Sequence, residues 1–225
     1  MRFAHRRESA EGSPTSEQVH QWLRRTSAPQ NELPAGAGVT VLLGRTADAA
    51  VGITQVEAFS TGFRFNLAVR LRRAGPEHVR GGLYMLVSSH VRPDVQIPVE
   101  DRLLLGLEYS DGRRASTLQD MHRFHRDAAP DDEQLVLAQQ GGGGGDLSVD
   151  QGYWVSPLPP EGPVTIVLAW PAFGMPESRT VVDSAAIRAA GERSQLLWPP
   201  QPVTEPPEPP PPPAPSSGWF AEPPG

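Results

Sequence analysis

The chain has 225 residues, a formal net charge of −6 and no cysteine. The absence of cysteine excludes disulfides, cysteine-ligated zinc and thiol nucleophiles, and the acidic balance disfavours non-specific binding of nucleic acid. The first residues, Met1–Glu8, are basic but lead into no apolar stretch, and no apolar run approaches the roughly 18 residues of a membrane span. We therefore expect a cytoplasmic protein that has no cofactor and does not insert into a membrane.

The N-terminal segment, residues 1–37, is polar and is expected to be mostly disordered, with one possible short helix over residues 16–25. Within that helix, Val19, Trp22 and Leu23 follow helical spacing. A helix of this length is marginal when isolated. We therefore expect it to pack either on its own domain or on a partner.

The clearest element of the following region is Phe59–Leu71. Apolar side chains at the odd positions from Phe63 to Leu71 alternate with polar or small ones at the even positions, which include Arg64 and Arg70. A period of two is typical of an antiparallel strand that has one face on a core and the other in water. The sequence therefore predicts a half-buried strand here.

Turn residues separate the other strand candidates, which are Val39–Leu43, Leu83–Val87, Leu103–Tyr109, Arg114–Leu118, Gln134–Ala138, Gly152–Ser156, Val164–Trp170 and Arg179–Val182. About eight short strands predict one all-β domain over residues 38–185, an antiparallel β-sandwich of the immunoglobulin-like or jelly-roll-like kind. The Asp-Gly pair within Ser110–Arg113 predicts a tight hairpin turn. The run Gly141–Gly145 is expected to be a flexible hairpin tip, since the following Asp146 would repel a phosphate.

The C-terminal region is expected to contain a helix and a tail. Asp183 can cap a helix that runs to about Leu197, and we expect the stretch 186–199 to pack on the domain. Residues 200–225 are rich in proline, so a disordered tail with polyproline II structure is expected there.

Two sets of residues are candidates for binding a protein partner. In the tail, Trp219 and Phe220 are either partner anchors or part of a spacer. On the outward face of the predicted strand, Arg64, Arg70 and Arg72 could bind an anionic partner. The alternative is an ordinary water-facing surface, which also discourages aggregation at a sheet edge.

His122, His125 and Asp127 are weak candidates for a metal or small-ligand site. On a helix the two imidazoles would share a face, but neighbouring arginines would repel a divalent cation, so a solvated loop is the favoured interpretation. No pattern of catalytic residues stands out. We therefore assign no catalytic residue and no metal ligand.

Several stretches resemble a family of uncharacterised actinobacterial proteins. The resemblance rests on Ser156–Ser178, on Leu105–Arg113 and on Leu196-Leu197-Trp198-Pro199. It covers roughly residues 50 to 200, and the lysine-free composition agrees with such a source. The resemblance implies no activity, because no function is assigned to that family.

These patterns favour a non-enzymatic protein-interaction or scaffold module, in which the proline-rich tail serves as a tether. Two alternatives stay open. One is an enzyme or small-ligand-binding β-sandwich with a site near His122, His125 and Asp127, and the other is a structural subunit of a larger assembly. A concave pocket with convergent polar groups would favour the enzyme or ligand-binding protein, and an exposed apolar patch would favour a scaffold.

Overall fold

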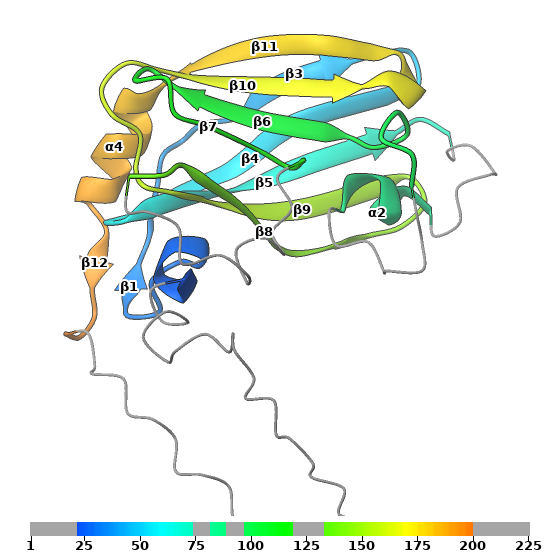
Figure 1. Ribbon diagram of the computed structural model, residues 1–225. Coiled ribbons are helices and arrows are strands. Elements are labelled where there is room, and N and C mark those ends of the chain that lie inside the picture. The colour runs from blue at the N-terminus through cyan, green and yellow to red at the C-terminus, as the bar shows by residue number, and fades with distance from the viewer. Residues whose placement is uncertain (1–21, 74–81, 89–96, 119–132, 200–225) are drawn as a thin grey trace, which may run out of the picture.

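The computed structural model describes residues 22–73, 82–88, 97–118 and 133–199, whose regular structure consists mainly of antiparallel strands (Figure 1). Within these ranges, α2 (Gly82–Val87) and α4 (Ser184–Glu192) are helices, residues 22–26 are also helical, and a 3-10 turn, η1, covers Pro171–Phe173. The strands are β1 (Glu32–Leu33), β2 (Ala35–Gly36), β3 (Val41–Arg45), β4 (Ala49–Phe59), β5 (Gly62–Leu71), β6 (Leu104–Tyr109), β7 (Arg114–Ser116), β8 (Val136–Gly144), β9 (Ser148–Ser156), β10 (Pro163–Trp170), β11 (Met175–Asp183) and β12 (Gln195–Leu196).

Two larger sheets and one short ribbon organise these strands. In the six-stranded sheet the order is β2-β4-β5-β9-β8, and β3 also pairs with β4. In the four-stranded sheet the order is β11-β10-β6-β7, and β1 pairs with β12 in a separate ribbon. Every described strand pair is antiparallel, and neither sheet closes on itself. The predicted all-β, antiparallel character is therefore confirmed.

Strand β5 alternates as its sequence predicts. Phe63, Leu67 and Val69 are buried, whereas Arg64 and Arg70 on the opposite face are exposed. A slip by one residue would exchange the two faces and bury the arginines, so the hydrophobic pattern specifies the register of this strand.

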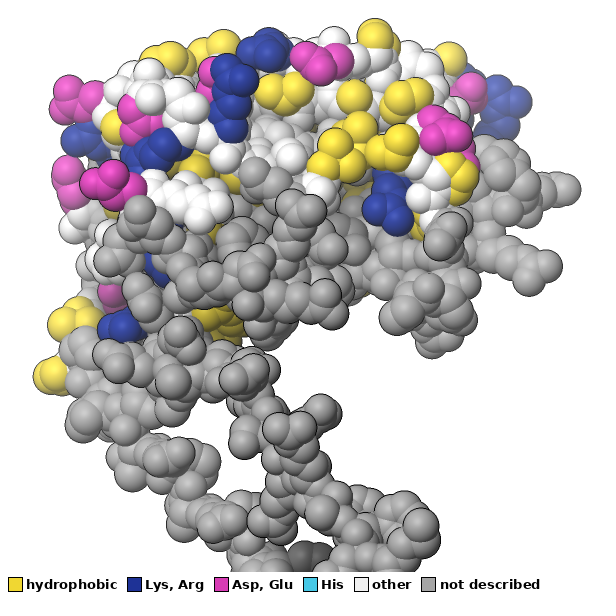
Figure 2. All heavy atoms as spheres, viewed as in Figure 1, with side chains coloured by type: hydrophobic (Ala, Val, Ile, Leu, Met, Phe, Trp, Pro, Cys, Tyr) yellow, Lys and Arg dark blue, Asp and Glu magenta, His cyan; other side chains and the backbone are white. Residues whose placement is uncertain are grey.

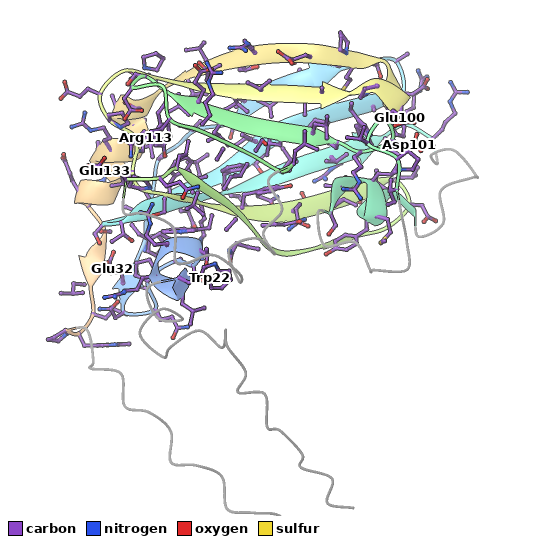
Figure 3. The ribbon with its side chains drawn as sticks, viewed as in Figure 1. Trp22, Glu32, Glu100, Asp101, Arg113 and Glu133 are labelled. Atoms are coloured by element: carbon purple, nitrogen blue, oxygen red, sulfur yellow. The ribbon has the colours of Figure 1, made fainter. Side chains whose placement is uncertain are left out.

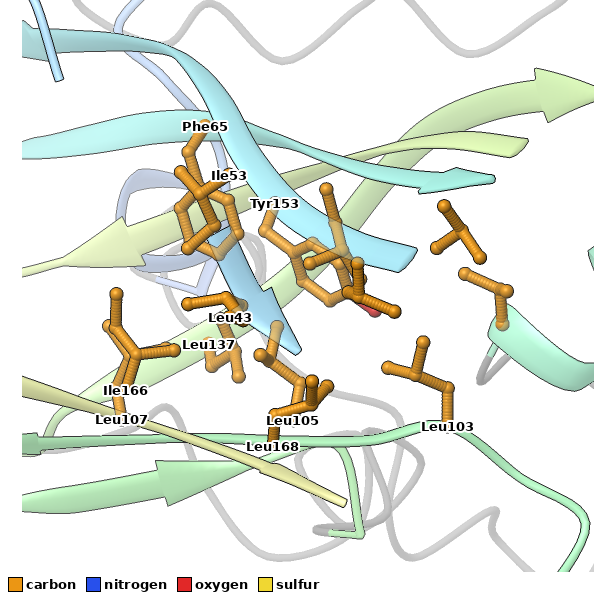
Figure 4. Close-up of a cluster of buried hydrophobic side chains, with 14 of the residues drawn as sticks. Leu43, Ile53, Phe65, Leu103, Leu105, Leu107, Leu137, Tyr153, Ile166 and Leu168 are labelled. Atoms are coloured by element: carbon orange, nitrogen blue, oxygen red, sulfur yellow. The ribbon is translucent and has the colours of Figure 1, made fainter. Parts of the chain in front are cut away.

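The buried faces of the two larger sheets pack against each other and share one core. Burying a large apolar side chain contributes roughly 1.5–3 kcal/mol, so this shared core holds the sheets together. Figure 4 shows side chains of both sheets that point toward one another, among them Leu43, Ile53, Phe65, Leu137 and Tyr153 from the six-stranded sheet and Leu105, Leu107, Ile166 and Leu168 from the four-stranded sheet.

The N-terminal helical residues pack on the outer face of the six-stranded sheet. Residues 22–26 are helical, and the guanidinium of the buried Arg25 donates to Ser156 Oγ (3.0 Å) and to the carbonyl of Gln134. In return, Trp154 Nε1 donates to the carbonyl of Arg25 (3.0 Å). Of the two predicted options for this helix, docking on its own domain is the one that its described residues adopt.

The segment Leu83–Val87, expected as a strand, is the helix α2 instead. Leu83, Leu86 and Val87 are its buried residues, and these positions share one face of a helix. A short, unbroken apolar run has no periodicity that separates a buried strand from a buried helix. The prediction was wrong because only the surrounding packing decides between the two.

The glycine run is not a flexible hairpin tip. Strand β8 continues to Gly144, and the turn to β9 follows over residues 145–147. A Cβ atom at Gly142 would collide with the side chain of Gln151, and one at Gly144 would collide with the carbonyl of Ser148. The close approach of β9 therefore requires glycine at these two positions of the strand.

The C-terminal helix is shorter than predicted. The Asp183 carboxylate caps α4 by accepting from the N–H of Ala185 (3.0 Å), but the helix ends at Glu192 instead of near Leu197. The chain then forms β12, which pairs with β1. β1 lies in the N-terminal segment that the sequence predicts to be mostly disordered. A strand partner far away in the sequence stops the helix, and local helix propensity carries no information about that partner.

Candidate binding surface

The predicted arginine face lies on the outer side of the six-stranded sheet, where carboxylates balance two of its charges. Arg64 Nε donates to Glu57 Oε2 (2.6 Å), and Arg70 Nη2 contacts both carboxylate oxygens of Asp150 (2.9 and 3.1 Å). The side chain of Arg72 is exposed. Exposed ion pairs contribute little to stability, so the main effect of these pairs is to cancel charge. The face therefore does not form a strongly positive patch.

A groove of about 690 Å³ opens on this face. It adjoins a bulge in β4, where the pairing with β5 shifts register between Thr54 and Glu57 and where Gln55 has a φ of 53°. A left-handed backbone at a non-glycine residue costs of order 1–3 kcal/mol and is common at binding sites. The polar side chains that line the groove are Thr40, Gln55, Glu57, Arg64, Asn66 and Gln140.

The second candidate binding surface is the free edge of β8. Gly145 donates to the carbonyl of Ser148 (2.8 Å), and Gly143 pairs with Asp150. The alternation of an antiparallel ladder then points the N–H and C=O groups of Gly142 and Gly144 away from β9. Within the described chain, these outward groups have no hydrogen-bond partner, and the stretch 140–147 is exposed.

The other edges of the two larger sheets are protected, but this part of β8 is not. β2 and β7 are very short, β3 contacts β11 through Ser178, and β11 itself carries Pro176, Glu177 and Arg179. Short length, charge and proline are the usual features that prevent strand addition. The exposed end of β8, residues 140–145, contains neither charge nor proline, so none of these protective features is present there.

A charged cluster surrounds the β6–β7 turn at one end of the four-stranded sheet (Figure 3). Gly112 has a φ of 88° and closes the hairpin that the Asp-Gly pair predicted. Arg113 donates to the Asp111 carboxylate (2.7 Å) and to the carbonyl of Glu133 (3.0 Å), and it lies over the ring of Tyr109. The Arg113 hydrogen bond lowers the pKa of Asp111, and burial raises the pKa of Tyr109. These contacts fix the turn and leave little of the cluster free for a ligand.

The β1–β12 ribbon exposes an apolar patch. Leu33, Leu196 and Trp198 are each more than half exposed, at 51%, 60% and 52%. In Figure 2, hydrophobic side chains are visible at the lower left, where Figure 1 places β1 and β12. The patch lies just before residue 200, where the predicted tail begins.

Several predicted site residues lie outside the described residues. They are Trp219 and Phe220 in the tail and His122, His125 and Asp127 in the polar segment. These assignments therefore stay predictions. Within the described ranges, no group of three or more histidine or carboxylate side chains could hold a metal ion. The helices of the same ranges include none that is both long and apolar enough to cross a bilayer.

The chain matches no family model, no curated protein and no solved structure. The resemblance to an actinobacterial family is therefore untested, and function has to be argued from the geometry of the domain.

Sequence pattern placed Arg64 and Arg70 on the outward face but missed both the groove and the edge. A period of two indicates which residues share a face of a sheet. It does not indicate which strand lies at an edge, and no local signal marks the bulge at Gln55. The run from Val136 to Gly145 is visibly uncharged in the sequence, but only the sheet order places β8 at the end of the sheet.

Proposed function

We propose that this chain is a non-enzymatic protein-interaction module that binds an extended segment of a protein partner along the free edge of β8. The observation that carries the proposal is the pair of outward-facing backbone groups at Gly142 and Gly144, which lack partners within the described chain. An added strand gains main-chain hydrogen bonds at such an edge. The glycines present no side chain that would hinder its approach.

The two facing sheets support an assignment as an antiparallel sandwich of the immunoglobulin-like or jelly-roll-like kind. They are open sheets that share one core, so their outer strands keep free edges. A cytoplasmic location, which the cysteine-free sequence favours, belongs to the same proposal.

The proline-rich tail, residues 200–225, is proposed as a tether beside this module, with Trp219 and Phe220 as partner anchors. A polyproline segment extends about 3.1 Å per residue, so the aromatic pair can reach a partner bound at some distance from the domain. Truncation at Val203 tests the tether. If every captured partner is retained by the truncated chain, the tail has no such role.

The edge itself is tested by adding a charge to it. The Cβ position of Gly143 meets open space, so Gly143→Lys is compatible with the fold and places a charge on the edge strand. Val181→Lys on β11 is the matched control, because Val181 is 65% exposed on another edge strand. Affinity capture should lose partners with Gly143→Lys and keep them with Val181→Lys. Identical partners for both variants and the unmodified chain would contradict the proposal.

The groove beside Gln55 supports a second candidate function, the binding of a small polar ligand. Its volume lies within the range of small-molecule sites, and Glu57 and Arg64 together carry no net charge. A library of neutral polar compounds can be screened by thermal shift. A compound that stabilises the unmodified chain but not Arg64→Ala would support this function. The third possibility, a structural subunit of a larger assembly, is tested by light scattering on the purified chain.

A further inference from the structure

We propose that the strand accepted by β8 is the β8 edge of a second copy of this chain, so that the two six-stranded sheets join into one continuous sheet. This inference rests on the proposed function and names the partner. The other free surface, the β1–β12 ribbon, offers no comparable argument, since nothing in the described chain indicates what covers it.

The register of the strand makes self-pairing geometrically consistent. The outward-facing groups belong to Gly142 and Gly144, because the neighbouring Gly143 and Gly145 face β9. An antiparallel copy centred on Gly143 sets Gly142 of one chain opposite Gly144 of the other. Both facing residues then direct their N–H and C=O groups toward the partner, and each facing pair forms hydrogen bonds in both directions.

The same register brings no repulsive contact between side chains. Gly141 and Gly143 point into open space, so the centre of the joint contains backbone alone. At its ends, Asp146 belongs to the turn that follows β8 and lies 3.7 Å from the Cβ position of Gly82, and the Gln140 amide donates to the carbonyl of Thr26 (2.9 Å), so neither side chain faces the joint with an unsatisfied charge. The nearest charge on β9, Asp150, is already paired with Arg70. The joint between two such edges therefore contains only backbone at its centre and brings no two like charges face to face.

Charge-swapped variants at the centre of the joint test the pairing. Gly143→Lys and Gly143→Glu each place like charges directly opposite one another, and we expect the dimer to dissociate roughly fivefold more readily or worse. An equimolar mixture of the two variants places opposite charges there and should restore a heterodimer. Sedimentation velocity over a wide range of concentration measures both effects, with Val181→Lys as the control for added charge.

Hydrogen exchange locates the interface. The amides of Gly142 and Gly144 should become protected as the concentration of the full chain rises, while the amide of Gly143, already bonded to β9, should not change. A chain that stays monomeric at all concentrations would overturn self-pairing, as would a dimer in which these two amides stay unprotected. If the monomer still loses captured partners on Gly143→Lys, the proposed function survives without this inference. If capture is unchanged as well, both fail.

Discussion

The same substitution, Tyr→Phe, should have opposite effects on stability at two buried tyrosines. Tyr109 and Tyr153 are almost fully buried, at 2% and 1% exposure. The Tyr109 hydroxyl donates to the carbonyl of Pro157 (2.7 Å), whereas no group of the described chain pairs with the Tyr153 hydroxyl. Tyr→Phe removes one oxygen in each case and keeps the ring, including the stacking of Tyr153 on Phe65. The two substitutions therefore differ only in the hydrogen bond that is lost.

The expected magnitudes follow from the two environments. A buried polar group without a partner costs about 1–3 kcal/mol, so Tyr153→Phe should stabilise the domain by about 1 kcal/mol. Tyr109→Phe removes a hydrogen bond worth about 0.5–1.5 kcal/mol and leaves the carbonyl of Pro157 unpaired, so it should destabilise the domain by at least that amount. The unfolding free energies of the two variants should thus differ by about 2 kcal/mol.

Urea denaturation followed by circular dichroism measures this difference. With a slope of about 1–3 kcal/mol per molar urea, the two midpoints should lie about 1 M apart, with the Tyr153→Phe midpoint above that of the unmodified chain. If Tyr153→Phe destabilises the domain as much as Tyr109→Phe does, the Tyr153 hydroxyl has a partner in solution, and the reasoning from burial fails.

Three further predictions concern the N-terminal docking, the glycine strand and the response to alkali. Arg25→Ala removes charged hydrogen bonds that are worth about 1.5–3 kcal/mol each, so the urea midpoint should fall; an unchanged midpoint would mean that the docking does not stabilise the domain. Gly143→Ala should be neutral or stabilising by up to about 1 kcal/mol, because its Cβ meets open space, whereas Gly144→Ala should destabilise, because its Cβ meets the backbone of β9. Equal midpoints for the two alanine variants would contradict the observed strand. Burial raises the pKa of both Tyr109 and Tyr153, so the folded state retains phenol protons that the unfolded chain releases above about pH 10. The free energy of unfolding is therefore unaffected by these tyrosines below that pH, and it should fall by about 1.4 kcal/mol per pH unit for each tyrosine above it. Tyr153→Phe should roughly halve the slope of the unfolding free energy against pH.

The parts of the fold that were predictable are those whose signal is local. The alternation from Phe63 to Leu71 reports a strand with one buried face, because successive side chains of any strand point to opposite sides. The Asp-Gly turn at Gly112 is equally local, since its positive φ is a property of that residue. The Asp183 cap also needs only its own neighbours along the chain.

The structure corrected the predictions wherever the decisive partner lies far away in the sequence. The apolar run at Leu83–Val87 fits a strand or a helix until the core that receives it is known. The helix after Asp183 ends early because the residues beyond it pair with β1 as β12. The glycines of β8 form a strand whose neighbour, β9, lies too close for any side chain at Gly144. The candidate binding edge of β8 likewise depends on segments that are far away in the sequence.

The amino-acid sequence by itself determined that this protein is built from antiparallel strands with one apolar and one polar face. The tertiary structure alone decided that β8 stands at the end of its sheet, that Arg64 and Arg70 meet carboxylates, and that a bulge at Gln55 opens a groove. The physical reason is that periodicity is a property of neighbouring residues. Edges, ion pairs and grooves are properties of segments that only folding brings together.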